Sequence, residues 1–103
     1  MENIPLERAI TDKIMRYLKS LSPHGWFFKT HGGSMQIAGL PDIIGVYHGR
    51  FIALEVKRPK LGRLTKLQEK ILGLIRAAGG IAGVVTSVEV VQQIIGGSFH
   101  VDG

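Results

Sequence analysis

Two strand-like segments separated by only two residues constrain this chain more than any other feature. They are LPDIIGVY (40–47) and RFIALEV (50–56), both rich in apolar and β-branched residues, with His48-Gly49 between them. A two-residue connection that ends in glycine predicts a tight β-hairpin, because histidine tolerates a left-handed backbone better than most residues and glycine adopts it freely. A hairpin also fixes which residues face each other, and here it pairs Ile44 with Ala53.

The same register brings charged side chains together at the open end of the hairpin. Asp42 falls opposite Glu55, and opposed residues on one face have Cβ atoms about 4.5–5.5 Å apart. Lys57 follows two residues later and shares that face because the side-chain period of a strand is two. Two such carboxylates repel unless a divalent cation lies between them, and Mg²⁺ takes one or two carboxylates while keeping several waters. The pattern therefore favours metal-dependent hydrolysis of a phosphodiester, with the lysine ammonium beside water or a phosphate oxygen.

Each part of this pattern also has a structural interpretation. A glutamate and a lysine two residues apart are often only the solvated end of a strand, and Pro-Asp before a strand is often turn chemistry. A β-bulge in the hairpin would shift the pairing by one residue and separate the two carboxylates.

The remaining segments predict a small mixed sheet flanked by helices. The order is α-β-β-β-α-β followed by a last helix, and the strand–helix–strand unit should be a right-handed parallel crossover. The chain of 103 residues is one domain with a core over about 5–95 and a loose tail over 96–103. Apolar spacing, capping residues and glycine stops predict helices over 5–21, 65–78 and 87–95 and further strands over 26–30 and 81–86.

Composition limits the partners and the metal chemistry. The net charge of +5 favours polyanionic partners, and the most basic stretch runs from Lys57 to Lys70. No cysteine is present, so any metal must be held by oxygen or imidazole. No apolar run approaches the roughly 20 residues of a membrane span, and the first residues do not resemble a signal sequence. We expect a cytoplasmic protein of a bacterial or phage-infected host cell, with no membrane partner.

The motif at residues 41–42 and 55–57, PD followed by EVK, resembles the PD-(D/E)xK nuclease signature. More narrowly, the chain resembles the virus-type replication-repair nuclease (VRR-NUC) family, in its stand-alone phage form, over about residues 5–85. The residues that carry the resemblance are GLPDIIGVYHGRFIALEVKRPKLGRLTKLQ. The resemblance implies a restriction-endonuclease-like core with the element order predicted above.

The resemblance also implies roles for particular residues. Asp42 and Glu55 match the metal-binding acids, the backbone carbonyl of Val56 would be a further ligand, and the metal would be Mg²⁺ or Mn²⁺. Lys57 matches the catalytic lysine, which orients or deprotonates water. Its main alternative role is a phosphate contact without catalysis.

Two further family positions fall on helices. Glu7 matches an additional acid that reaches the metal directly or through water, although an acid in the first turn also suits the helix dipole. Gln68 matches a glutamine on the helix after the E-x-K strand, although its spacing from Thr65 also fits a capping box.

Basic and polar residues next to these motifs are candidates for contacts with the phosphate backbone of DNA. One group follows the E-x-K strand and the other lies in or beside the glycine-rich loop before the PD motif. An ordinary solvated surface and an ordinary loop are the alternatives. The candidates are Arg58, Lys60, Arg63, Lys66, Lys29, His31 and Ser34.

The resemblance implies a structure-selective DNA endonuclease similar to Holliday-junction resolvases, working on branched DNA as a homodimer. The dimer surface is expected on an apolar face of the first or last helix. Two alternatives remain at this point: a nuclease directed to flaps or nicks with a partner protein, and a non-catalytic nucleic-acid-binding module.

Overall fold

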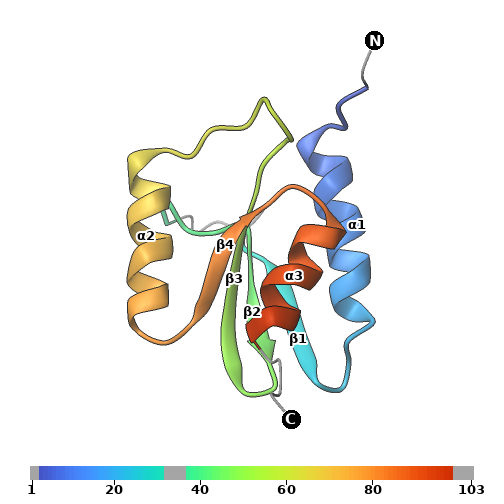
Figure 1. The fold of residues 1–103 in the computed structure, drawn as a ribbon, viewed down its shortest axis with the longest axis vertical. Coiled ribbons are helices and arrows are strands. Elements are labelled where there is room, and N and C mark those ends of the chain that lie inside the picture. Colours follow the sequence, from blue (N-terminus) through green and yellow to red (C-terminus); the bar gives the residue numbers. More distant parts are fainter. Residues whose placement is uncertain (1–2, 32–36, 99–103) are drawn as a thin grey trace.

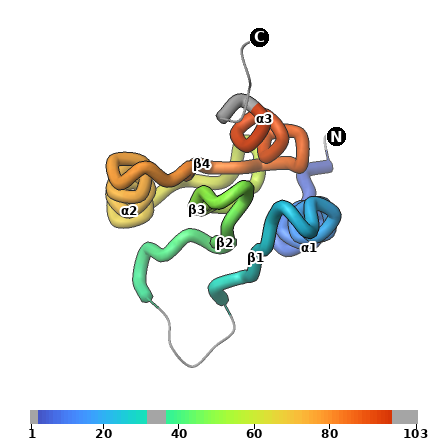
Figure 2. Tube along the Cα trace, turned by 90° about the horizontal axis from the view of Figure 1, so that it is seen from below, coloured from blue at the N-terminus to red at the C-terminus, as the bar shows by residue number. Residues whose placement is uncertain are grey.

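The computed structural model describes residues 3–31 and 37–98 and contains one four-stranded sheet with three helices. The strands lie in the order β1-β2-β3-β4, and only the β3–β4 pair is parallel. Helices α1 and α3 pack on one face of the sheet and α2 packs on the other (Figures 1 and 2). The elements are α1 (Glu7–Lys19), β1 (Gly25–Lys29), β2 (Ile43–Tyr47), β3 (Arg50–Val56), α2 (Lys66–Ala77), β4 (Ile81–Val85) and α3 (Val88–Ser98).

The predicted hairpin is confirmed. Strands β2 and β3 pair antiparallel from Tyr47 opposite Arg50 to Ile43 opposite Leu54. The turn between them has positive φ angles of 49° at His48 and 80° at Gly49, the backbone that a tight two-residue hairpin requires. The pairing carries no bulge, so the residues just beyond its last pair keep the expected register.

The parallel pairing of the predicted crossover is also confirmed, because β3, α2 and β4 follow one another and β3 pairs parallel with β4. Helix α2 begins with the predicted capping box. The Thr65 hydroxyl accepts a hydrogen bond from the Gln68 N–H at 3.1 Å, and the Gln68 side-chain oxygen accepts one from the Thr65 N–H at 2.9 Å.

The core lies mainly between the sheet and the α1/α3 layer. Alternate residues of β3, namely Ile52, Leu54 and Val56, are fully buried against Ile14 and Leu18 of α1 and their neighbours. Because Glu55 and Lys57 alternate with these residues, their side chains belong to the other face of the sheet. On that face α2 packs over β3 and β4.

The structure corrects several predicted boundaries and the expected dimer surface. Helix α1 is shorter than 5–21, and α3 continues to Ser98, so residues 96–98 of the expected tail are helical while residues 99–103 lie outside the described part. The apolar faces of α1 and α3 are buried in the core, because the helices need those side chains to cover the sheet. They are therefore not free to form a dimer interface. Over residues 3–31 and 37–98, the structure has no helix with the length and apolar character of a membrane span.

Candidate active site

Asp42 lies directly before β2 and is held by both neighbouring strands. Its backbone carbonyl accepts a hydrogen bond from the Thr30 N–H at 2.8 Å, and its Oδ2 accepts one from the Val56 N–H at 2.8 Å. The Thr30 hydroxyl donates to the Pro41 carbonyl at 2.7 Å, which fixes the residue before the aspartate. The Asp42 residue is 9% exposed, so both its position and its burial are set by the sheet.

Glu55 faces Asp42 from β3 and is only 2% exposed. Among the described residues, its Oε2 has no hydrogen-bond partner. Burial, the hydrogen bond with Asp42 and the negative charge of Asp42 raise the pKa of Glu55 to about 9. For Glu55 to be ionised, positive charge must lie close to it. Lys57 supplies some of this charge but does not offset the effects that raise the pKa.

Lys57 and Glu7 lie close enough to act on the same carboxyl. Burial and Asp42 raise the pKa of Glu55 by more than the Lys57 ammonium lowers it, and the Glu7 carboxylate adds a smaller increase. Glu7 also lines a cavity of about 280 Å³ that is shared with Asp42, Lys29 and His31. The N-terminus of α1 and the adjoining ends of β2 and β3 thus bring together four of the five side chains expected at the catalytic site, all except Gln68.

His31 has a contact that the sequence did not predict. It was expected to touch DNA, but its Nε2 is hydrogen-bonded to Oδ1 of Asp42. The imidazole remains 59% exposed and lines the cavities on both sides of it. The one signal in the sequence is indirect: His31 follows β1, and the β1–β2 pairing places the end of β1 beside the start of β2. His31 therefore belongs to the environment of the carboxylate pair.

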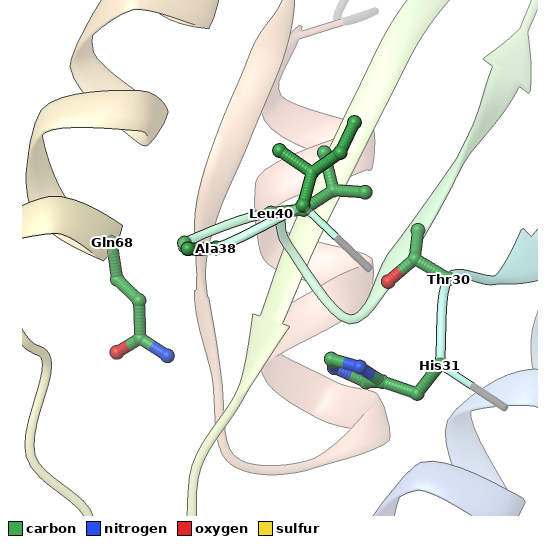
Figure 3. A pocket seen from close by; sticks show the side chains of 7 residues that line it. Thr30, His31, Ala38, Leu40 and Gln68 are labelled. Carbon is green, nitrogen blue, oxygen red and sulfur yellow. The ribbon is translucent and has the colours of Figure 1, made fainter. Parts of the chain in front are cut away.

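Gln68 lines a second cavity of about 280 Å³ together with His31, Thr30 and the segment 37–40. Figure 3 shows Gln68 projecting from α2 on one side of this cavity and His31 lying on the other. The loop approaches α2 so closely that a Cβ at Gly39 would lie 2.6 Å from Leu67 Cγ, and Gly39 has a φ of 78°. Gln68 thus caps its helix and also lines a cavity with His31, the hydrogen-bond partner of Asp42.

The basic candidates are either arginines that donate hydrogen bonds to backbone carbonyls or exposed lysines. Arg58 donates from Nε to the Pro5 carbonyl and from Nη2 to the Ile4 carbonyl, both at 2.9 Å, so it secures the segment that leads into α1 and Glu7. Arg63 donates to two carbonyls of its own loop, those of Lys60 and Gly62. The remaining candidates are Lys29, Lys60 and Lys66, whose residues are exposed, and Ser34, which lies outside the described residues.

The donor set of the site fits a divalent cation that needs few protein ligands. In the described part of the chain, no group of three or more His, Cys, Asp or Glu side chains is arranged to hold a metal. The carboxylates of Asp42 and Glu55 nevertheless face each other, and Oε2 of Glu55 is buried without a partner. Mg²⁺ binds through one or two carboxylates plus water, which matches this pair.

The unpartnered carboxyl of Glu55 predicts a stability effect. Its pKa in the folded protein, about 9, lies above its ordinary value of 4.5, so its contribution to stability is greatest below pH 4.5 and is lost as the pH rises toward 9. Without divalent cations, Glu55→Gln should therefore raise the melting temperature near pH 8 by at least about 4 °C, the shift that ~1 kcal/mol produces in a domain of this size. Thermal unfolding of both proteins from pH 5 to 9 tests this.

The gap between Glu55→Gln and the parent should widen with pH across that range. The control is Glu89→Gln on α3, an exposed carboxylate whose replacement should change little. A Glu55→Gln protein that is less stable than the parent at every pH would contradict the assignment of an unfavourable buried charge.

Comparisons with known proteins connect this fold to one kind of domain. No family model matches the sequence, and no curated protein matches it. A solved structure described as a VRR_NUC domain superposes with a TM-score of 0.68 at 21% sequence identity, over 87% of this chain and 94% of the other. The chain therefore has the fold of a VRR-NUC domain, as the sequence resemblance implied.

Proposed function

We propose that this protein is a divalent-metal-dependent DNA endonuclease that hydrolyses phosphodiester bonds in branched DNA. The observation that carries the proposal is the buried carboxylate pair of Asp42 and Glu55 with Lys57 beside it. A protein that only bound nucleic acid would have no use for an uncompensated carboxylate beside a phosphate. The VRR-NUC fold supports a nuclease, and its substrate would be DNA.

The metal would be Mg²⁺ or Mn²⁺. Asp42, Glu55 and the backbone carbonyl of Val56 would hold it, with Glu7 reaching it directly or through water. Such an ion supplies an activated water and neutralises the charge that develops on the phosphate. It would also give the buried Oε2 of Glu55 the partner that the described residues do not provide.

The protein's own groups have separate tasks in this proposal. The ammonium of Lys57, on the same strand face as Glu55, would orient the attacking water and contact a phosphate oxygen. His31 holds one oxygen of Asp42 and the Val56 N–H holds the other, so the aspartate is oriented before substrate arrives. Gln68 would contact the substrate or water from the α2 side of the site, with its capping role retained.

Phosphate contacts would come from the residues around this opening. Lys60, Arg63 and Lys66 follow the catalytic strand, and Lys29 lines the cavity next to Asp42. Arg58 would act mainly through its two hydrogen bonds to the segment before α1. This distribution of positive charge would place the backbone of a DNA strand across the carboxylate pair.

Removing the Asp42 carboxylate tests the reaction directly. With Mg²⁺ or Mn²⁺, we expect the parent to cut a four-way junction in preference to flap, nicked and linear duplex substrates. Asp42→Asn should reduce the rate by about 10² or more, the scale of losing a group that stabilises transition-state charge. Single-turnover cleavage of the four substrates is the measurement, with Glu89→Gln as a control that should cut normally.

A parent protein that binds but does not cut these substrates would leave only a binding module. Preferred cleavage of flaps or nicks would support the flap-directed alternative. An Asp42→Asn protein that cuts as well as the parent would show that the site is wrong.

Gly62 predicts a positioning effect on Lys57. A Cβ at residue 62 would lie 2.6 Å from Lys57 Cβ and 3.0 Å from the Arg58 backbone nitrogen, so Gly62→Ala must displace the end of β3 or the loop after it. We expect a single-turnover rate at least about 10-fold lower, on the scale of a misplaced reacting group. Junction affinity, measured with Ca²⁺, should change little.

The matched control is Gly73→Ala on α2. Apart from its own helix backbone and chain neighbours, no described residue has an atom within 4 Å of the added Cβ there, and alanine should stabilise the helix by up to about 1 kcal/mol. Normal cleavage by Gly62→Ala, or equal loss in both variants, would rule out this role for Gly62.

A homodimer follows from the same proposal, because paired incisions across a junction need two sites and the chain carries one. The dimer surface would be the part of the α2 face of the sheet that α2 does not cover. Trp26, Val46 and Phe51 lie side by side on neighbouring strands of this face. The ring of Phe28 packs against that of Trp26, with 5.3 Å between the ring centroids. These four side chains are 39–65% exposed and carry no charge, which suits a second copy better than a phosphate backbone.

Charge on this open face should separate the subunits. Sedimentation analysis should show a dimer for the parent and a monomer for Trp26→Glu combined with Phe28→Glu. Leu74→Glu on α2, where the leucine is 59% exposed, is the control and should stay dimeric. A monomeric parent, or dissociation by Leu74→Glu alone, would refute this interface.

A further inference from the structure

Two arginines share a cavity at the end of the sheet opposite the carboxylate pair. Arg50 begins β3 and Arg76 lies in the last turn of α2, and together with Gly80, Ile81, Ala82 and Ile94 they line a cavity of about 350 Å³. The first residues of β3 and β4 lie at the lower end of the sheet in Figure 1, whereas Glu55 and Lys57 fall at the far end of β3.

Each guanidinium group is held through its Nε, and its Nη atoms have no hydrogen-bond partner among residues 3–31 and 37–98. Arg50 donates from Nε to the Gly79 carbonyl at 3.1 Å, and Arg76 donates from Nε to the Ala82 carbonyl at 2.8 Å. No described residue that lines the cavity is acidic. Two like charges held at one cavity repel each other, and an anion with several acceptor oxygens would remove the repulsion while using the paired Nη donors.

The position of this cavity relates it to the proposed reaction site. Lys57 lies seven positions after Arg50, just past the end of β3, and a strand rises about 3.3 Å per residue, so the two residues are about 23 Å apart along the strand. Duplex DNA advances about 3.4 Å per base pair, and this distance corresponds to about 7 base pairs. Lys66 and Lys70 continue the positive charge along α2 between the two ends.

We infer that Arg50 and Arg76 form a second phosphate-binding site, which holds the backbone of a duplex arm about 7 base pairs from the bond that is cut. The inference rests on the proposed DNA substrate and extends it, because it states how much duplex beside the cleavage point the protein needs. A purely structural role is the alternative, since the same hydrogen bonds tie Arg50 to the turn after α2 and Arg76 to β4.

Arm length distinguishes a phosphate contact from a structural one. Four-way junctions with arms of about 5 and about 15 base pairs would be titrated by fluorescence anisotropy, using Asp42→Asn protein with Ca²⁺ to prevent cutting. Combining Arg50→Gln with Arg76→Gln should weaken binding to the long-armed junction by at least about 10-fold and leave the short-armed junction unchanged. The salt dependence on long arms should also fall, by about 0.9 in logarithmic slope for each lost phosphate contact. Arg16→Gln on α1 is the matched control.

The other outcomes are separable. Equal losses on short and long arms, or no loss on either, would overturn the inference. Pyrophosphate that shifts the arginine side-chain NMR signals without any effect of arm length would assign the site to a free phosphate group and overturn the DNA assignment. If the parent protein with Ca²⁺, which retains Asp42 and both arginines, binds neither junction, the proposed function itself fails. If it binds both equally well, only the second site is lost.

Discussion

The burial of Glu55 against Asp42 is the interaction on which the rest of this structure depends. Glu55 is 2% exposed, faces another carboxylate and has one oxygen without a partner among the described residues. In the absence of a bound ligand, such a group lowers the stability of the folded protein. The pKa of Glu55, raised to about 9 by burial and by Asp42, expresses that cost. Such a group is retained when a bound cation converts the cost into function, which is the basis of the proposed metal site.

The surrounding elements hold this unfavourable pair in place. Asp42 is bonded to β1 through Thr30 and to β3 through the Val56 N–H, and those bonds leave it little freedom to turn away from Glu55. Arg58 fixes the segment before Glu7 by two hydrogen bonds to backbone carbonyls. The buried side of β3 is packed against α1 and α3, so the strand that carries Glu55 and Lys57 cannot shift without disturbing the core.

Local signals in the sequence were sufficient for the hairpin, the parallel crossover and the capping box. His48 and Gly49 determine a tight turn, and the turn determines that Asp42 meets Glu55. Contacts between distant residues were beyond such reasoning. His31 lies 11 residues from Asp42, and Arg58 lies 53 residues from Pro5. Neither pairing follows from spacing, because the first depends on the pairing of β1 with β2 and the second on how the segment before α1 lies against the residues after β3. The close approach of Gly62 to Lys57 is likewise visible only once the loop after β3 is folded back on the strand.

The most direct test of the central claim is whether a divalent cation stabilises the folded protein through the carboxylate pair. Thermal unfolding with increasing Mn²⁺ or Mg²⁺, at constant pH and ionic strength and without DNA, measures this independently of cleavage. A ligand at 100 times its dissociation constant adds about 2.7 kcal/mol to the free energy of unfolding, so the melting temperature of the parent should rise clearly and that of Asp42→Asn should not. An unchanged melting temperature in the parent, or an equal rise in both proteins, would contradict the account.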